Sequence, residues 1–394
     1  MKIFQRLLVA PAALGLLSPL SANATEVNLN EISNYSDVES IELSNSFDDN
    51  SSNQSQLLAG GEGLVDSYDS DSFDGGFSET TTASFSANFY AGIFYDDDGG
   101  NDRDDNLTTG YDFGIALNTS FTGSDSLDVA IDAGNADAPG VAEFDGDTTT
   151  NEALTVDEIT YTFPLGEKAT IMVGDNADAS SLFTTACVYG GPSNTLDACG
   201  NVNANVDNGG VMAGAAYDFG NGLTAAVGWA GDENDIANEE ATDAYGINFA
   251  YTGDSYGVSV TYGSTEDGVA VNDNMEVDTF VAVNAYYTPD SGLPSISVGY
   301  EAGEDGSVVG NNDGLSNFFV GLTFDEVGEG EFGLAMGTRV NTVEDTDAQY
   351  MYEAYYSYPI NDGMTITPLV FVQDVSTANT DDNTGVMVKT SFSF

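Results

Sequence analysis

The sequence predicts an all-β protein, a transmembrane antiparallel β-barrel of about 16 strands with long external loops and short periplasmic turns. From residue 83 onward, segments of about ten residues alternate apolar side chains with small or polar ones, the period-two pattern of a strand with two different faces. The links between these segments alternate between short and long, as they do in membrane-spanning barrels. No apolar run after residue 24 is long enough for a membrane-spanning helix, so strands are expected to cross.

Each expected strand is one such alternating segment. The clearest is YDFGIALNTSFTG, which begins at Tyr111 and places its aromatic and aliphatic side chains on one face. The expected strands cover residues 84–95, 109–121, 125–133, 155–165, 168–174, 210–219, 222–230, 243–252, 255–264, 277–287, 293–302, 316–324, 329–339, 348–358, 363–373 and 384–394. Their number is sixteen, and a hairpin hidden in the longest link or a misjudged segment at 125–133 would make it eighteen.

The segment before the barrel has two parts. Residues 1–24 have the composition of a cleaved signal peptide: Lys2 and Arg6 precede an apolar run, and Ala22-Asn23-Ala24 forms a small-x-small cleavage site. An uncleaved anchor is less favoured because the run is shorter than the roughly 20 residues that a spanning helix needs. Residues 25–82 are acidic, rich in Ser and Asn and without periodicity, so we expect a disordered segment before the barrel at 83–394.

Charge excludes one class of partner. The chain has 6 basic and 65 acidic residues and a net charge of −59, so nucleic acid is not expected to bind. Blocks of like charge indicate solvated surface, which explains most of the acids without a specific ligand. Such a charge is tolerable in saline surroundings, because the screening length falls from about 10 Å at 0.1 M salt to about 3 Å at 1 M.

Catalytic and metal chemistry are not expected. The chain has no histidine, which removes Ser-His, Cys-His and His-metal arrangements, so we expect no enzyme, no metal site and no cofactor. A carboxylate pair could serve a glycosidase, but with 65 acids any chosen pair is expected by chance. The acidic link DDDGGNDRDDN fails the spacing of a calcium-binding loop.

The two cysteines predict a disulfide. Cys187 and Cys199 form an even pair in an exported chain, and a metal pair is the minor interpretation because no histidine or third cysteine completes a site. Both lie in the longest link, from about residue 175 to 209. Closing a loop of this size is worth roughly 3 kcal/mol on the chain-entropy estimate.

Strand parity predicts which charged side chains face the lumen. The expected lumen acids are Asp112, Asp128, Asp132, Glu158, Glu301 and Glu353. Arg339 and Lys389 are the basic residues on well-patterned strands. Because carboxylate rings favour cations, the lumen should prefer cations weakly. Many small inward residues favour an open aqueous channel.

The order of the links resembles that of sixteen-stranded general porins, whose third external loop folds into the barrel and narrows the pore. This resemblance implies a constriction lined by loop acids opposite a basic wall. The candidates are Asp175, Asp178, Asp197 and Asp207 on the loop, with Arg339 and Lys389 on the wall. An outward-facing lid stapled by the disulfide is the alternative.

FDGGFSETTTASFSANFYAGIFYDDDG and VNLNEISNYSDVES resemble the cyanobacterial porins that are grouped with the OprB-type, carbohydrate-selective porins and are often labelled iron-uptake porins. Members usually carry an S-layer-homology domain, and this chain lacks one, so no peptidoglycan tether is expected. The resemblance implies passive diffusion of small hydrophilic solutes, including ions and carbohydrates, across the outer-membrane lipid, and analogy with other sixteen-stranded barrels implies a homotrimer. Phe394 resembles the terminal signature by which the barrel-assembly machinery recognises its substrates. The alternative is a non-conducting surface protein, an adhesin or phage receptor anchored by the barrel.

Overall fold

The structure, a computed structural model, describes residues 80–95, 106–136, 141–144, 146, 152–206, 209–233, 236, 242–271, 274–290, 292–306, 314–375 and 382–394. Every described residue belongs to one compact unit, Phe73–Phe394. The expected signal peptide at 1–24 and the acidic link 96–105 lie outside the described residues. So do residues 25–79 of the segment expected to be disordered, whereas Thr81 and Thr82 at its end already belong to the first strand of the barrel.

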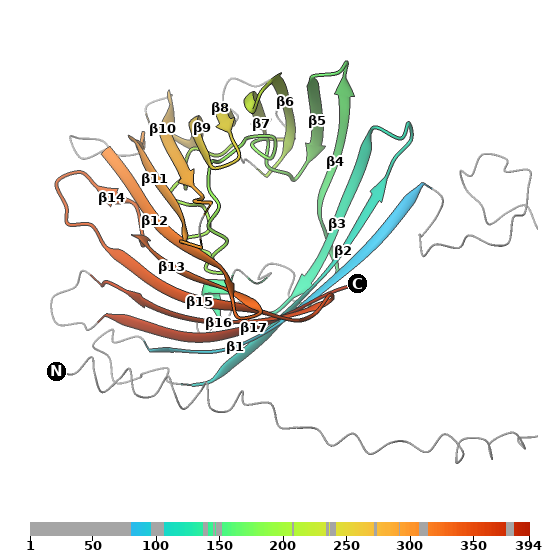
Figure 1. Ribbon diagram of the computed structural model, residues 1–394. Helices are drawn as coiled ribbons and strands as arrows, with labels where there is room; N and C mark the ends of the chain where they lie inside the picture. Colours follow the sequence, from blue (N-terminus) through green and yellow to red (C-terminus); the bar gives the residue numbers. More distant parts are fainter. Residues whose placement is uncertain are drawn as a thin grey trace, which may run out of the picture. The chain divides into compact units, whose positions relative to one another are not determined.

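The described strands form one antiparallel sheet that closes on itself (Figure 1). The strands are β1 (Thr81–Tyr95), β2 (Thr108–Thr119), β3 (Ser126–Gly134), β4 (Thr155–Leu165), β5 (Ala169–Asp175), β6 (Val211–Gly220), β7 (Leu223–Gly231), β8 (Asp243–Thr252), β9 (Tyr256–Val271), β10 (Asn274–Tyr287), β11 (Ser295–Glu304), β12 (Gly314–Val327), β13 (Gly330–Thr338), β14 (Thr342–Val343), β15 (Tyr350–Asn361), β16 (Met364–Gln373) and β17 (Asn383–Ser393). β1 pairs with both β2 and β17, which closes the ring. β14 has two residues and only extends β12, while β13 pairs directly with β15, so sixteen strands make the barrel.

All sixteen expected strands are confirmed, and the alternative of eighteen is not realised in the described residues. The largest differences are at the hairpin of β9 and β10, whose backbone pairing continues to Val271 and Asn274, beyond the expected ends at residues 264 and 277. The sequence analysis also missed β14 and a single 3₁₀ turn, η2 (Ala142–Phe144), because neither is long enough to show a period. The barrel therefore has the predicted topology with longer walls at that hairpin.

The two faces of the barrel wall differ as the alternation predicts. Along β8, Ile247 and Phe249 are 42% and 57% exposed, whereas Asn248 between them is 1% exposed. The outward faces of the other strands also present exposed valine, leucine and aromatic side chains. Such an apolar outer band suits lipid, and a closed barrel satisfies every backbone group without a free edge. Within the described residues, no helix is long and apolar enough to cross a membrane.

The tight turn between β2 and β3 is organised by Asp125. Its Oδ1 atom accepts hydrogen bonds from the Thr122 hydroxyl at 2.6 Å and the Thr122 amide at 2.7 Å, and from the Ser120 hydroxyl at 3.0 Å. The hydroxyl of Tyr161 on β4 donates to the other oxygen at 2.8 Å. These bonds, led by the Thr122 hydroxyl, hold the pKa of Asp125 well below its usual range, because they all favour the ionised form.

This turn gives a pH-dependent prediction. A depressed folded-state pKa means that Asp125 contributes stability above the unfolded value, about 4, and loses it as pH falls through the folded value. We expect Asp125→Asn to lower the thermal midpoint of the folded barrel at pH 7 and to have a smaller effect at pH 3. Heat-modifiable gel mobility measures this, with the exposed turn acid Glu167→Gln as the control. An equal decrease of the thermal midpoint at pH 7 and at pH 3 would contradict the stabilising role of the ionised Asp125.

Candidate functional site

Loop 3 is defined as residues 176–210 between β5 and β6, and its described residues, 176–206 and 209–210, lie inside the barrel (Figure 1). Its outgoing arm, residues 176–189, points alternate backbone amides at the wall, and Thr184, Ala186 and Val188 donate to side chains of β8, β9 and β11. The acceptors are Asn248 Oδ1 at 3.0 Å, Ser259 Oγ at 2.9 Å and Ser297 Oγ at 2.9 Å. Loop 3 is therefore not the outward-facing lid that was the alternative expectation.

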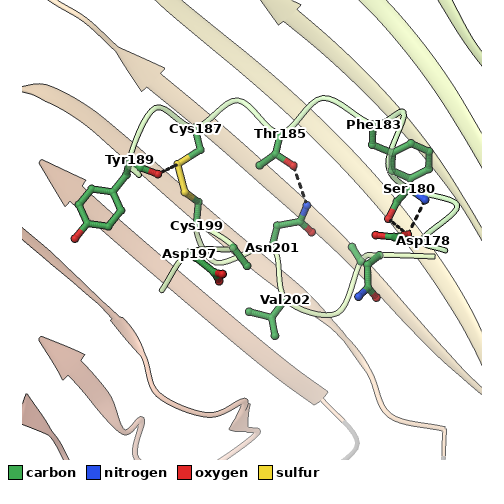
Figure 2. Close-up of a pocket in the computed structure, with 13 residues that line it drawn as sticks. Asp178, Ser180, Phe183, Thr185, Cys187, Tyr189, Asp197, Cys199, Asn201 and Val202 are labelled. Atoms are coloured by element: carbon green, nitrogen blue, oxygen red, sulfur yellow. Dashed lines mark hydrogen bonds between the residues drawn. A yellow bond between two sulfur atoms is a disulfide. The ribbon is translucent and has the colours of Figure 1, made fainter. Parts of the chain in front are cut away.

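The return arm, residues 190–206, also lies on the wall, and a disulfide joins the two arms (Figure 2). Cys187 and Cys199 are bonded with their Cα atoms 6.5 Å apart, so the predicted disulfide is confirmed. The carbonyl of Cys199 accepts a hydrogen bond from Asn284 Nδ2 on β10 at 2.9 Å. The disulfide thus closes loop 3 near its tip, and hydrogen bonds to β8, β9, β10 and β11 hold the loop against the wall.

Glycines on the inward face let loop 3 lie directly against the wall. A Cβ atom on Gly299 of β11 would stand 1.8 Å from the carbonyl oxygen of Cys199, and one on Gly263 of β9 would stand 2.8 Å from the Cα atom of Ala204. Other inward glycines that would meet loop 3 are Gly228, Gly246, Gly321 and Gly337. The small inward residues that predicted an open channel therefore also form the seat of the loop. Glycine at inward parity positions of adjacent strands is the sequence signal that could have revealed this.

Part of loop 2, the link between β3 and β4, also lies in the lumen. In η2 the Glu143 carbonyl accepts from the Asn194 amide of loop 3 at 2.8 Å, and its carboxylate accepts from the hydroxyl of Thr195 at 3.1 Å and from the Gln373 amide of β16. Burial raises the pKa of Glu143. The sequence analysis did not predict this contact between loops.

An apolar cluster fills the lumen beside β12–β17. Tyr189 of loop 3 packs against Phe319 and Tyr355, with ring centroids 5.2 and 5.7 Å apart. Residues from both loops and from the wall complete the buried cluster: Tyr90, Ala136, Val141, Phe144, Leu196, Cys199, Ala335, Met351, Leu369, Phe371 and Met387. This part of the lumen is packed like a protein core.

Part of the inward face of β1–β4 stays accessible from within, although Tyr90, Gly110 and Thr160 on these strands are buried. Ser84 and Ser86 on β1 and Ala116 and Asn118 on β2 are exposed although they face inward. Inward-facing residues under loop 3, such as Asn248, are instead almost fully buried. We use "open wall" below for the inward faces of β1–β4. Water therefore reaches the open wall, whereas loops cover much of the rest.

Four of the predicted lumen acids lie on the open wall. Cross-strand pairing places Asp112, Asp128, Asp132 and Glu158 on the inward faces of β2, β3 and β4, as strand parity predicts. Each is only partly buried, so its charge is accessible from the lumen. The open wall is therefore polar and acidic.

The first turn of loop 3 brings a further acid toward this wall. The negative charges of Asp157, Asp128 and Asp178 all act on the carboxylate of Glu158. Asp178 belongs to loop 3, whereas the other three acids belong to β3 and β4. A charge on the loop thus acts on a charge of the wall. Among the described residues, no group of three or more acids or cysteines is arranged to hold a metal ion.

A cleft of about 460 Å³ lies between the arms of loop 3 (Figure 2). Asp178 and Asp197, both predicted constriction residues, line it together with the disulfide. Asp178 Oδ1 accepts from the Ser180 amide at 2.7 Å, and Asp197 is exposed. These two acids therefore face water between the arms.

Several predicted site residues lie elsewhere in the structure than the sequence predicted. Asp175 is paired with Ile159 and Val211, two outward-facing positions, so it lies on the outer face at the end of β5 rather than at a constriction. Glu301 and Glu353 face inward as predicted, but they are 0% and 4% exposed beneath loop 3 and do not line the passage. Asp207 lies outside the described residues. Parity alone cannot tell a covered inward position from an open one.

The two basic candidates are not paired across a constriction. The Arg339 guanidinium donates to the Asp374 carbonyl at 3.0 Å and to the Gln349 side chain, so links at one end of the barrel hold it. Lys389 faces inward on β17, where it pairs with Tyr90 of β1, and is partly buried. The expected basic wall opposite the loop acids is therefore absent from the described open wall, which carries acids instead.

A closed sixteen-strand barrel with an apolar outer band and an internal loop defines a multi-pass β-barrel protein of the outer-membrane type. Among solved structures, Pseudomonas putida OprB at high pH superposes with a TM-score of 0.56 at 9% identity, over 80% of this chain and 94% of that one. A loop-deletion mutant of the outer-membrane protein OmpT of Vibrio cholerae gives 0.53 at 14% identity, over 80% and 100%. The anion-selective porin of Comamonas acidovorans gives 0.54 at 13% identity, over 80% and 99%.

No protein-family model matches the chain, and no curated protein matches it by sequence. At these identities the structural likeness establishes the fold, which this chain shares with outer-membrane porins. The cyanobacterial resemblance remains an expectation from sequence.

Proposed function

We propose that the protein is a porin for passive diffusion of small hydrophilic solutes and ions, and that it prefers cations weakly. The observation that carries the proposal is the contrast between covered and accessible parts of the lumen wall. Loops and apolar side chains pack over most of the wall, while β1 and β2 keep inward-facing serine and asparagine in contact with water. A barrel that served only as an anchor would have no need of a hydrated polar wall inside it.

The cation preference rests on the charges beside this passage. Asp128 and Glu158 lie on the open wall, and the charge of Asp178 on loop 3 acts on Glu158. Carboxylates lining a pore lower the energy of a passing cation and raise that of an anion. The preference is weak in concentrated salt because screening shortens the reach of each charge to about 3 Å at 1 M.

Assembly is a second part of the proposal. The chain shares its fold with porins, and we propose a homotrimer in which each barrel conducts separately. Channels would then open in conductance steps that come in groups of three.

Planar-bilayer recording of the purified, refolded protein tests the function. We expect stable conductance steps and, across a gradient of about 0.1 M salt, a reversal potential that leans toward cations. Absence of conductance from a protein shown to be folded and inserted would overturn the proposal and favour a surface protein anchored by the barrel. A reversal potential of zero or of anion sign would overturn the proposed cation preference but not the proposed porin function.

A further inference from the structure

The return arm of loop 3 ends on a buried carboxylate that the solute passage does not touch. Glu301 of β11 is 0% exposed, so it cannot act as a lining acid. Its Oε1 atom accepts the consecutive backbone amides of Asn203 and Ala204, at 2.8 and 2.7 Å. Its Oε2 atom accepts the side-chain amides of Asn203 and Asn317, at 2.7 and 3.0 Å. Four N–H groups therefore converge on one side chain.

A small network fixes the partners of Glu301 in turn. Asn341, beyond the end of β13, accepts from Asn203 Nδ2 at 3.0 Å and from Asn317 Nδ2 at 2.7 Å. The hydroxyl of Thr338 donates to Asn317 Oδ1 at 3.0 Å, which orients that amide with its nitrogen toward Glu301. The network joins loop 3 to β11, β12 and the end of β13. A shift of the return arm would break several bonds together.

Glu301 differs chemically from the wall residues that hold the outgoing arm of loop 3. The outgoing arm is held by hydroxyl and amide oxygens, each accepting a single loop amide. A carboxylate only accepts hydrogen bonds, so it suits four donors, and bonds to a charged acceptor are roughly twice as strong as neutral ones. Burying a carboxylate is costly unless it is fully hydrogen-bonded, so Glu301 and the return arm are tied to one position.

We propose that Glu301 is a positioning residue: it holds the return arm of loop 3 against the wall and thereby sets the width of the passage. This inference rests on the proposed porin function. It assigns to Glu301 a role different from the cation attraction expected of an inward acid. The residue acts through loop 3, whose opposite side faces the lumen.

Glu301→Gln tests the proposal with almost no change in size. The glutamine side chain keeps one oxygen for the two backbone amides, but its NH₂ group then faces the NH₂ groups of Asn203 and Asn317. We expect the return arm to leave the wall and enter the passage. The amides of Asn203 and Ala204 should exchange with deuterium faster, and open-channel conductance should fall roughly twofold with frequent brief closures, because conductance follows the open cross-section.

A charge swap and two further variants complete the test. Adding Asn203→Asp to Glu301→Gln supplies an acceptor for the new NH₂ group, so exchange and conductance should return most of the way to wild type. Glu304→Gln removes an exposed acid from the same strand and should change neither. Asn203→Ala removes the side-chain donor on loop 3 and leaves the wall unchanged, so it replaces Glu301→Gln as the test if that variant does not fold. It should speed deuterium exchange of the amides of residues 203 and 204.

The outcomes separate the two proposals. Folded Glu301→Gln with wild-type exchange, conductance and noise would overturn the role of Glu301, and so would failure of the swap to restore them. A silent wild-type channel would overturn the porin function and with it the setting of passage width, while exchange would still report whether Glu301 holds the loop. Heat-modifiable mobility establishes folding for every variant.

Discussion

The double variant Asp128→Asn/Glu158→Gln is expected to lose most of the cation preference of the channel while conducting nearly as well as the wild type. Both acids lie on inward faces of the open wall, and the charge of Asp178 on loop 3 acts on Glu158. A charge about 4 Å from an ion in water contributes about 1 kcal/mol, so two charges change the permeability ratio severalfold. The reversal potential across a gradient of about 0.1 M salt measures the change.

The control for this variant removes the same number of charges elsewhere. Glu167→Gln/Asp362→Asn alters two exposed acids in tight turns between strands, and the reversal potential should not move. The difference between variant and wild type should also shrink at about 1 M salt, since screening then limits each charge to about 3 Å. An unchanged reversal potential in the lumen variant, with folded barrels, would remove these acids from the selectivity of the passage.

Gly299→Ala is expected to displace loop 3 and to narrow the channel. The added Cβ atom would stand 1.8 Å from the Cys199 carbonyl oxygen, whereas ordinary contact begins near 3.4 Å. The clashing atom belongs to the backbone and the disulfide restrains Cys199, so rotation of a side chain cannot relieve the clash. The return arm must move off the wall by more than 1 Å. Single-channel conductance should fall roughly twofold, because conductance follows the open cross-section.

Gly190→Ala is the matched control, because its Cβ atom would meet nothing within 4 Å and its backbone is not left-handed. Alanine is no worse than glycine in a strand, so Gly299→Ala should still form the barrel. Wild-type conductance from a folded Gly299→Ala channel would show that the seat of loop 3 does not determine the passage.

The strands and their faces could be predicted because they depend on local pattern. A period of two reports which side chains face lipid, so Ile247 and Phe249 were separated correctly from Asn248. The disulfide was likewise predictable, because residues 187 and 199 are the only cysteines of the chain. The membership of the open wall followed from parity for Asp112, Asp128, Asp132 and Glu158.

The candidate site was predicted less well, because parity says which way a side chain points and not what lies over it. Glu301 and Glu353 share the inward face with Asp128, yet loop 3 buries them. Asp175 was assigned to the loop, but backbone pairing continues β5 through it and turns it outward. Arg339 was placed on a strand, whereas β13 ends one residue earlier and links at that end of the barrel bind the guanidinium.

The sequence by itself determined the strand count, the alternation of faces, the order of short and long links and the covalent closure of loop 3, since each depends on neighbouring residues or on the chain's two cysteines. Only the tertiary structure decided where loop 3 lies and which part of the lumen wall stays accessible. Glu301 lies 98 residues from Asn203, and Tyr189 lies 164 residues from Glu353, whose carboxylate accepts its hydroxyl at 2.6 Å. Such contacts leave no periodic trace, because they form only after the barrel has brought distant strands around the loop.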